Sequence, residues 1–231
     1  FCFVEGETRT NMKVIDPVNH TNTDINEPGV TVSKEILDAL LDDLLEKISE
    51  GDIVVISGSM PKGSPEDTYY VWTKACREKG AKVILDADGA LFATGVKASP
   101  YLVKPNNHEL SRFAGRKLET VEELEAEAKK MMQDYGIKKV VVSMGGDGAL
   151  YVTEEKTIYA EGLKVPVGST VGAGDSVVAA LAFAEENGSS LEDTVRLSTA
   201  TGGANVMCSG TQAAEYEVIE SVMPKVVFRT L

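Results

Sequence analysis

Ser169-Thr170-Val171-Gly172-Ala173-Gly174-Asp175-Ser176 joins a strand-like segment to an apolar helix. Glycines let the backbone approach a bound group closely, and a helix N-terminus presents unpaired N–H groups and a positive dipole end to an anion. An aspartate in the first helical turn is placed to take a proton from an attacking hydroxyl. The run therefore indicates phosphoryl transfer with Asp175 as the base. The alternative is a tight strand-to-helix connection in which Asp175 is an ordinary first-turn acid.

Around this run, helix and strand patterns alternate from Ser33 onward with short connections. An apolar stripe at helical spacing from Ile36 to Ile48 precedes a buried strand pattern at 52–56. The same analysis predicts strands at 83–85, 101–103 and 140–142, and two further β segments before Gly172. The alternation predicts an α/β fold, a doubly wound and mostly parallel sheet with helices on both faces.

Capping signals set the expected helix boundaries. Ser64-Pro65-Glu66-Asp67 combines a capping box with proline at the first helical position, and Gly80 ends that helix. Thr120 begins a helix that Gly136 ends. Two helices follow Asp175, with Gly188 between them and Ser190 opening the second.

The first thirty residues do not show the alternation of helix and strand patterns seen in the rest of the chain. Thr8 to Asp16 alternates like a strand, while His20 to Pro28 is polar and rich in turn residues, so this part is predicted to be a β hairpin. We expect residues 1–30 to be the remnant of a β lid with its connection, and residues 31–231 to be the core.

Composition restricts the class of protein. The 231 residues are 43% hydrophobic, enough for a full core, and three cysteines without metal spacing suggest reduced thiols in a cytoplasmic protein. No apolar stretch is long enough to span a bilayer. The net charge of −13 argues against nucleic acid or an anionic membrane as partner. An anionic small substrate would need local bases, for which Arg9, Lys13, Lys62 and Lys104 are candidates.

Loops at expected strand ends carry further chemistry. Ser57-Gly58-Ser59-Met60-Pro61-Lys62-Gly63 has the glycine gap of a nucleotide P-loop, but Ser64 stands where the lysine should follow, which excludes that motif. Asn106 and Glu109, three apart, would share a helix face and suit Mg²⁺, although a capping box fits equally well. Ser143-Met144-Gly145-Gly146-Asp147-Gly148 would line a nucleotide or make a hairpin turn.

Taken together, these runs resemble the ribokinase-like (PfkB) sugar kinases, and within them the hexose-phosphate branch that contains the 1-phosphofructokinases and tagatose-6-phosphate kinases. The matching segments stand in family order: Thr8-Arg9-Thr10-Asn11, residues 57–63, Lys104-Pro105-Asn106 with Glu109, Ser143-Met144-Gly145 with Gly148, and residues 169–176. The resemblance implies ATP-dependent phosphorylation of a sugar phosphate, with fructose 1-phosphate ranked ahead of tagatose 6-phosphate and fructose 6-phosphate. It also implies Mg²⁺ as cofactor and allows a homodimer through the lid.

The resemblance assigns roles to individual residues. Asp175 would be the catalytic base, and the backbone of Gly172, Ala173 and Gly174 would form an anion hole. Arg9, Asn11 and Ser59 would join Asp175 in contacting the sugar phosphate. Glu109 and Asn106 would hold Mg²⁺ through water. The groups expected to border ATP are Lys104, Asn106, Ser143, Gly145, Gly146, Gly148, Thr170, Gly172 and Gly174, with Asn205 and Cys208 near the adenine edge.

The sequence departs from the family in its N-terminal motifs. The Asn-Pro-Ala-Asp type sugar-binding run and the glycine pair with Lys and Asn are not found, so we expect an N-terminally truncated fragment without the first core strand. The alternative from another class is then a nucleotide-binding fragment that binds Mg-ATP with little or no turnover. If the kinase interpretation holds, Glu109, Gly146 and Gly174 should lie along one edge of the sheet around one cleft.

Overall fold

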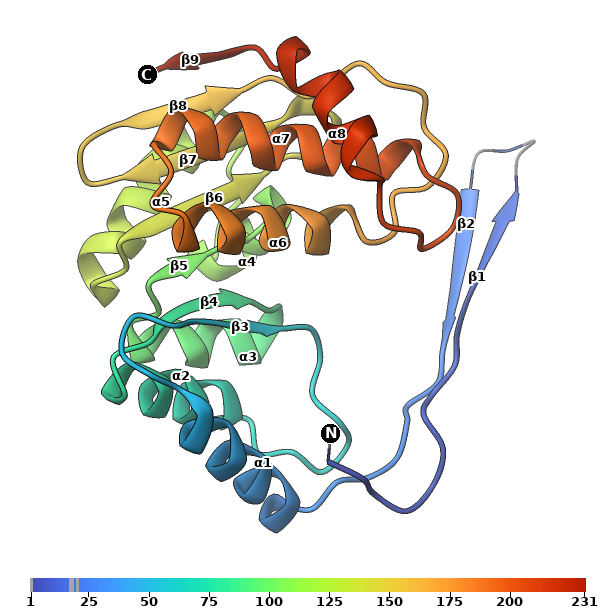
Figure 1. Ribbon diagram of the computed structural model, residues 1–231, viewed down its shortest axis with the longest axis vertical. Helices are drawn as coiled ribbons and strands as arrows, with labels where there is room; N and C mark the ends of the chain where they lie inside the picture. The colour runs from blue at the N-terminus through green and yellow to red at the C-terminus, as the bar shows by residue number, and fades with distance from the viewer. Residues whose placement is uncertain (1, 17–18, 20) are drawn as a thin grey trace.

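A computed structural model describes residues 2–16, 19 and 21–231 as a seven-stranded mixed sheet between helices, with a separate two-stranded hairpin (Figure 1). The strands of the large sheet are β3 (Ile53–Ser57), β4 (Lys82–Asp86), β5 (Leu102–Val103), β6 (Lys139–Ser143), β7 (Ala149–Thr153), β8 (Thr157–Ala160) and β9 (Phe228–Thr230). They lie in the sheet in the same order as in the chain. β3 to β6 are parallel, and β7, β8 and β9 each pair antiparallel with the strand before.

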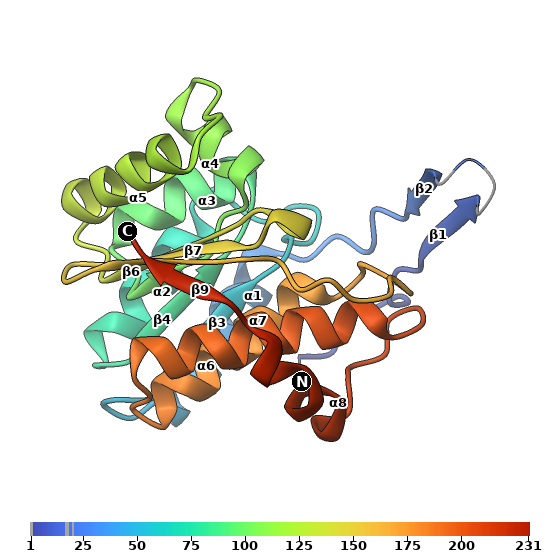
Figure 2. The ribbon, with the colours of Figure 1, turned by 90° about the horizontal axis from the view of Figure 1, so that it is seen from above.

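Helices cover both faces of this sheet (Figure 2). One face carries α1 (Lys34–Lys47), α2 (Thr68–Glu78), α3 (Gly89–Gly95), α4 (Asn107–Ala114) and α5 (Val121–Tyr135). The other carries α6 (Ala173–Glu186) and α7 (Leu191–Met207), and α8 (Tyr216–Val222) packs on α7. The prediction of a mostly parallel α/β sheet with helices on both faces is confirmed.

Alternation along the strands divides the core between the two faces. Val83 and Leu85 of β4 pack toward α1–α5, whereas Ile84 between them packs toward α6 and α7, and all three are fully buried. Strands buried on both faces read as continuous apolar runs, which is why these segments were recognisable from sequence.

Most predicted boundaries agree with the structure, but the start of α2 does not. Ser64 does not cap a helix: its N–H and Oγ both donate to the carbonyl of Pro61, at 3.2 and 2.8 Å. Thr68 makes the same two bonds to Pro65, so two consecutive tight turns precede α2, which begins at Thr68. The turns satisfy the hydroxyls locally, and the expected capping box is therefore wrong.

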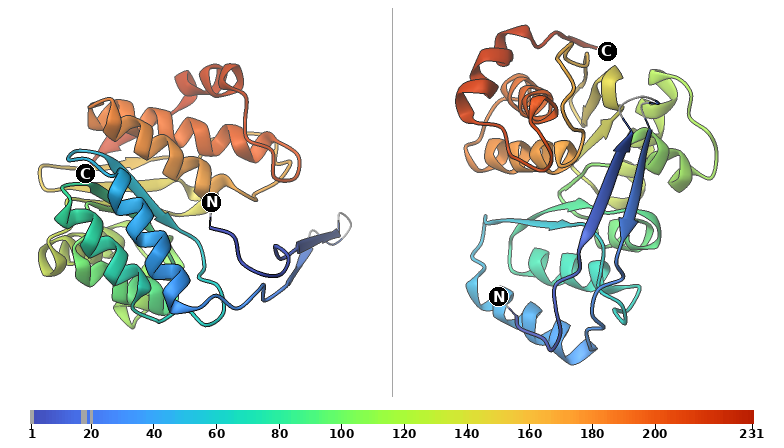
Figure 3. Two further views of the ribbon diagram at one scale, coloured as in Figure 1. Left: turned by 60° about the horizontal axis from the view of Figure 1, so that its bottom comes forward. Right: turned by 90° about the vertical axis from the view of Figure 1, so that its right-hand side faces the viewer.

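The predicted hairpin is confirmed. β1 (Asn11–Asp16) pairs antiparallel with β2 (Thr21–Asn26), and Figure 3 shows the pair standing away from the body of the molecule. Residues 17, 18 and 20 at its turn lie outside the described residues. The base of the hairpin is tied to the core where Val32 donates to Lys62 O at 3.0 Å.

None of the helices in the described part of the chain combines the length and apolarity needed to cross a bilayer. The three cysteines are free thiols.

Candidate active site

The loops that carry the predicted site residues leave the sheet at one edge. β3 to β6 are parallel, so their carboxyl ends meet there, and β8 returns to the same edge because two successive antiparallel pairings restore the direction of β6. Residues 57–63, 104–109, 143–148 and 161–172 follow these strand ends. Ligands of open α/β sheets bind at this edge.

The first turn of α6 is open at this edge. Gly172 precedes the helix with φ 78°, a left-handed conformation that glycine adopts without strain. The N–H groups of Gly172, Gly174 and Asp175 have no hydrogen-bond partner within the described residues. Asp175 itself is exposed. The turn thus presents unpaired donors beside an accessible carboxylate, which is the arrangement that an anion and an attacking hydroxyl require.

Lys104 brings a positive charge to the same turn. It is 6% exposed, and a Cβ added at Gly174 would lie 3.6 Å from its Nζ. The ammonium is paired with Asp86 at the end of β4, with 3.1 Å between Nζ and Oδ1. Burial raises the pKa of Asp86, Lys104 lowers it, and the nearby charge of Asp175 raises it further. Lys104, Asp86 and Asp175 therefore form one electrostatic group. Asp86 was not identified from the sequence because it stands in no recognisable motif.

A cavity of about 380 Å³ opens between the β6–β7 turn and the first turn of α6. Eight predicted site residues line it: Lys104, Ser143, Gly145, Gly146, Gly148, Thr170, Ala173 and Gly174. The β6–β7 connection is also the hairpin turn that the sequence left open as the alternative, so the two interpretations of residues 143–148 are compatible. The size suits a small-molecule ligand.

The apolar end of this cavity was missed by sequence reasoning. It is lined by Leu163, Val165 and Val206, with Gly202 and Gly203 on α7. A Cβ at Gly202 would lie 2.8 Å from Val177, and one at Gly203 would lie 2.7 Å from Leu163. Adjacent glycines inside a helix are costly, so this pair was the available signal of close approach.

Asn106 and Glu109 form the capping box that the sequence left open. Asn106 Oδ1 accepts from the N–H groups of His108 and Glu109 at 2.9 and 2.8 Å, and Glu109 Oε2 accepts from Asn106 N at 2.8 Å. Burial raises the pKa of Glu109. The Asn106 N–H and the charge of Lys104 lower this pKa, and the charges of Asp88 and Asp86 raise it. Glu109 Oε1 makes no hydrogen bond within the described residues.

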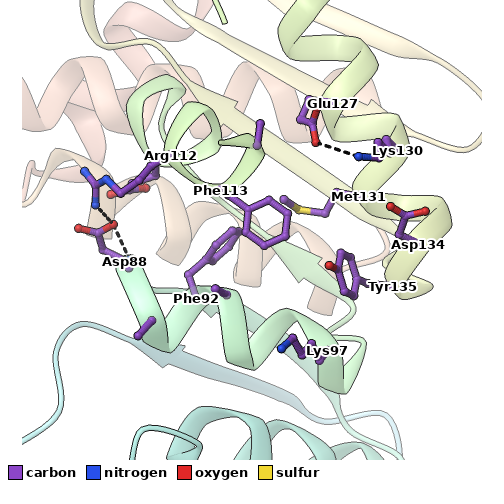
Figure 4. Close-up of a pocket in the computed structure, with 15 residues that line it drawn as sticks. Asp88, Phe92, Lys97, Arg112, Phe113, Glu127, Lys130, Met131, Asp134 and Tyr135 are labelled. Atoms are coloured by element: carbon purple, nitrogen blue, oxygen red, sulfur yellow. Dashed lines mark hydrogen bonds and ion pairs between the residues drawn. The ribbon is translucent and has the colours of Figure 1, made fainter. Parts of the chain in front are cut away.

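Glu109 lines a second cavity, of about 570 Å³, rather than the one that Gly146 and Gly174 share. Figure 4 shows Phe92 and Phe113 in its middle, with the Asp88–Arg112 ion pair at one end and Lys97 and Tyr135 toward the other. The three loops thus share one edge of the sheet, as expected, but they surround two cavities instead of one cleft. Lys104 lowers the pKa of Glu109 and of Asp86, so the two cavities are coupled electrostatically through its charge.

Two of the predicted sugar-phosphate residues meet at the base of the hairpin. Arg9 Nη2 donates to Ser59 Oγ at 2.9 Å, and both residues line a cavity of about 350 Å³. Asn11 begins β1, where it pairs with Asn26. Arg9 and Ser59 thus line a different cavity from Gly174, and Asn11 lines neither of the two.

Asn205 and Cys208 do not line the 380 Å³ cavity. Asn205 is 3% exposed, its Nδ2 donates to Gln212 O at 3.1 Å, and its Oδ1 has no partner within the described residues. A Cβ at Gly172 would lie 3.8 Å from that oxygen, so Asn205 lies against the turn before α6.

Comparison with known proteins gives consistent matches. The profile of the pfkB family carbohydrate kinases matches residues 1–217. The 1-phosphofructokinase of Bacillus subtilis is 36% identical over 226 residues, which are 98% of this chain and 72% of that protein. The 1-phosphofructokinase of Haemophilus influenzae is 34% identical over 227 residues, with the same shares of both chains.

Solved structures agree with these sequence matches. Phosphofructokinase-2 from Escherichia coli, in complex with potassium, superposes with a TM-score of 0.87 at 31% identity, covering 94% of this chain and 71% of that one. A possible 1-phosphofructokinase from Thermotoga maritima superposes with a TM-score of 0.87 at 26% identity, covering 100% of this chain and 73% of that one.

Proposed function

The chain belongs to the pfkB family of carbohydrate kinases, and we propose that it uses ATP to phosphorylate fructose 1-phosphate, giving fructose 1,6-bisphosphate. The observation that carries the proposal is the first turn of α6. There, the unpaired N–H groups of Gly172, Gly174 and Asp175 stand beside the buried Lys104 ammonium and the exposed Asp175 carboxylate.

In the reaction we propose, Asp175 accepts the proton of the sugar hydroxyl as its oxygen bonds to the γ-phosphorus of ATP. The bond from that phosphorus to the bridging oxygen breaks, and ADP leaves. The N–H groups of the α6 turn donate to the equatorial oxygens of the transferring group, where negative charge is held in the transition state. Lys104 neutralises part of the same charge. Donors fixed in advance by the helix need no reorganisation during transfer.

The residues at this edge fit a magnesium ion held largely by phosphate and water. Mg²⁺ in nucleotide sites takes one or two carboxylates together with phosphate oxygens. Glu109 offers the free Oε1, whereas Asn106 Oδ1 already accepts two backbone N–H groups and would act through water. When bound, the ion would neutralise charge on the phosphates of ATP.

We propose further that residues 1–30 form a lid over the sugar, with residues 31–231 as the kinase core. The Arg9–Ser59 hydrogen bond supports this, because it connects the base of the hairpin to the loop after β3. A guanidinium there gives an acidic protein the local positive charge that a phosphorylated sugar needs. Asn11 would extend this contact along β1.

A coupled assay of ADP release with fructose 1-phosphate, fructose 6-phosphate and tagatose 6-phosphate tests the substrate. We expect the highest kcat/KM with fructose 1-phosphate, and equal values for all three would contradict the ranking. Calorimetry with Mg-ATP, combined with this assay, distinguishes the kinase from the alternative, a nucleotide-binding fragment without turnover. Nucleotide binding without turnover on any of the three sugars would favour a binding module over a kinase.

A further inference from the structure

We propose that Asp86 is a positioning residue that holds the Lys104 ammonium beside the first turn of α6. Its carboxylate Oδ1 lies 3.1 Å from Lys104 Nζ, and the two side chains are 16% and 7% exposed. This assignment rests on the proposed kinase function and adds a residue that none of the sequence motifs contains.

The backbone of two neighbouring strands fixes this pair. Leu85 of β4 is in register with Val103 of β5, so Asp86 and Lys104 are the next residues on adjacent parallel strands. Lys104 N donates to Leu85 O at 3.3 Å, which extends the pairing to the lysine itself. Ser57 is the register partner of Asp86 on β3, and its hydroxyl lowers the pKa of the carboxylate from the other side. Asp86 therefore stands between Ser57 and Lys104 on the neighbouring strands before any ligand binds.

The lysine points from this anchor into the proposed site. Lys104 lines the 380 Å³ cavity, and its Nζ would lie 3.6 Å from a Cβ at Gly174. A lysine side chain has four rotatable bonds, so a buried counter-charge is what selects one position for the ammonium. A phosphate at the α6 turn would meet the ammonium already in place, which lowers the cost of ordering it during the reaction.

The charges around the pair suit this role. Asp175 lies close enough to raise the pKa of Asp86, and Lys104 lowers the pKa of both Asp86 and Glu109. Lys104 is thus the cation shared by two carboxylates, Asp86 at the end of β4 and Glu109 in the first turn of α4. Without Asp86, the ammonium can turn toward Glu109 and leave the α6 turn.

A double-mutant cycle between Asp86→Asn and Lys104→Met tests the proposal. Each single variant should lower kcat by about 100-fold, the loss that a displaced charged group commonly causes. The double variant should be no slower than Lys104→Met alone, because Asp86 acts through the lysine. Additive losses would overturn the proposal, and so would a higher Mg²⁺ requirement of Asp86→Asn, which would make Asp86 a metal-holding group instead.

ATP affinity by calorimetry gives a readout that does not depend on turnover. In the wild-type background, Lys104→Met should weaken ATP binding about tenfold or more, as expected for a lost hydrogen bond to a charged group. In the Asp86→Asn background the same change should matter less than threefold. An equal effect in both backgrounds would overturn the positioning role. If the wild type binds ATP but phosphorylates no sugar, the kinase proposal fails while this cycle still decides the role of Asp86.

Two further variants control for folding. Glu185→Gln removes half of the buried Lys139–Glu185 ion pair at the opposite end of the sheet, so it should lower the melting temperature but leave kcat and ATP affinity unchanged. Asp86→Glu retains the charge with one added methylene and should recover part of the kcat lost in Asp86→Asn. If Asp86→Asn does not fold, Asp86→Ser takes its place in the cycle, where a coupling below threefold would contradict the proposal.

Discussion

Asp175 is exposed in the first turn of α6, so its carboxylate is accessible to the hydroxyl of a ligand. Asp175→Asn keeps the shape of the side chain but removes the proton acceptor. We expect turnover to fall by about 100- to 10,000-fold, the usual contribution of a general base, with ATP affinity nearly unchanged. Steady-state kinetics with nucleotide calorimetry would check this. A loss of less than tenfold would make Asp175 an ordinary first-turn acid.

We expect the two glycines of the β6–β7 turn to have different roles: Gly148 is needed for packing, and Gly146 for ligand binding. Gly148 has φ 107°, and a Cβ there would lie 2.0 Å from Ala160 O, whereas a Cβ at Gly146 would meet nothing within 4 Å. Gly148→Ala should lower the free energy of unfolding by about 3 kcal/mol, through strain and overpacking.

Gly146→Ala is the matched control and should change that free energy by less than about 0.5 kcal/mol, as surface substitutions usually do. Gly146 lines the 380 Å³ cavity, so an added methyl group should lower ATP affinity instead. Thermal unfolding and calorimetry on both variants would check the pair. Equal destabilisation by the two substitutions would contradict this division.

Residue-level prediction from the sequence worked where a residue type is tied to a backbone geometry. Gly172 before α6 and Gly136 after α5 both have positive φ, as their places in the pattern suggest. Asp86 was missed because its partner, Lys104, is 18 residues further along the chain and meets it only across two strands. Spacing along a sequence carries no information about such a pair.

At the scale of elements, the two ends of α6 have different surroundings. Its N-terminus forms the candidate site, and Glu185 near its C-terminus pairs with Lys139 of β6. Tyr101 lies beside this pair, with the ammonium groups of Lys82 and Lys139 5.3 and 5.6 Å from its ring centre. Burial, and then the charge and hydrogen bond of Glu185, raise the pKa of Tyr101 to about 12.

The raised pKa of Tyr101 predicts how stability changes in alkali. Because the folded phenol holds its proton more tightly than the unfolded one, its contribution to stability is complete below pH 10 and is lost as the pH rises through about 12. Glu185→Gln should lower this pKa without returning it to the ordinary value, since burial remains. Phenolate absorbance, compared with Tyr101→Phe, would measure the change. An unchanged pKa in Glu185→Gln would remove Glu185 as a cause.

Long elements with capping residues were predictable, and short ones were not. Thr120 caps α5 by the expected reciprocal bonds, with Glu123 N donating to Thr120 Oγ1 at 3.2 Å. α3 was missed because its seven residues begin and end with glycine and offer no apolar stripe. β9 has three residues, and only its pairing with β8 identifies it as a strand. Such elements are stabilised by tertiary contacts rather than by local preference.

At the scale of the whole molecule, the hairpin is an apolar surface held away from the core (Figure 3). Met12 and Ile25 are register partners, 57% and 55% exposed, and Val14 beside them is 50% exposed. An isolated two-stranded sheet is marginally stable in water, and its edges can pair with another chain. We propose that two copies of this chain associate through this face.

Light scattering on eluted protein would measure this association. The wild type should be a dimer, and the paired change Met12→Thr with Ile25→Thr should make it a monomer. Val227→Thr, at another residue that is 57% exposed, should leave the dimer intact and is the control. A wild type that remains monomeric at all concentrations would exclude the lid dimer.

The seven strands of the large sheet follow one another in space in the order in which the ribosome makes them. Each of these strands can therefore pair with the strand made just before it, and none has to be inserted between two others. Because the contacts between strands are then local in the chain, this order favours fast folding. The 380 Å³ cavity, which we propose binds the nucleotide, differs, because α6 and α7 complete it late in synthesis. Stalled nascent chains ending after β6 should already resist protease over β3–β5, while protection by ATP should appear only once α7 has emerged. Protease sensitivity of β3–β5 until release of the full chain would rule out this order of assembly.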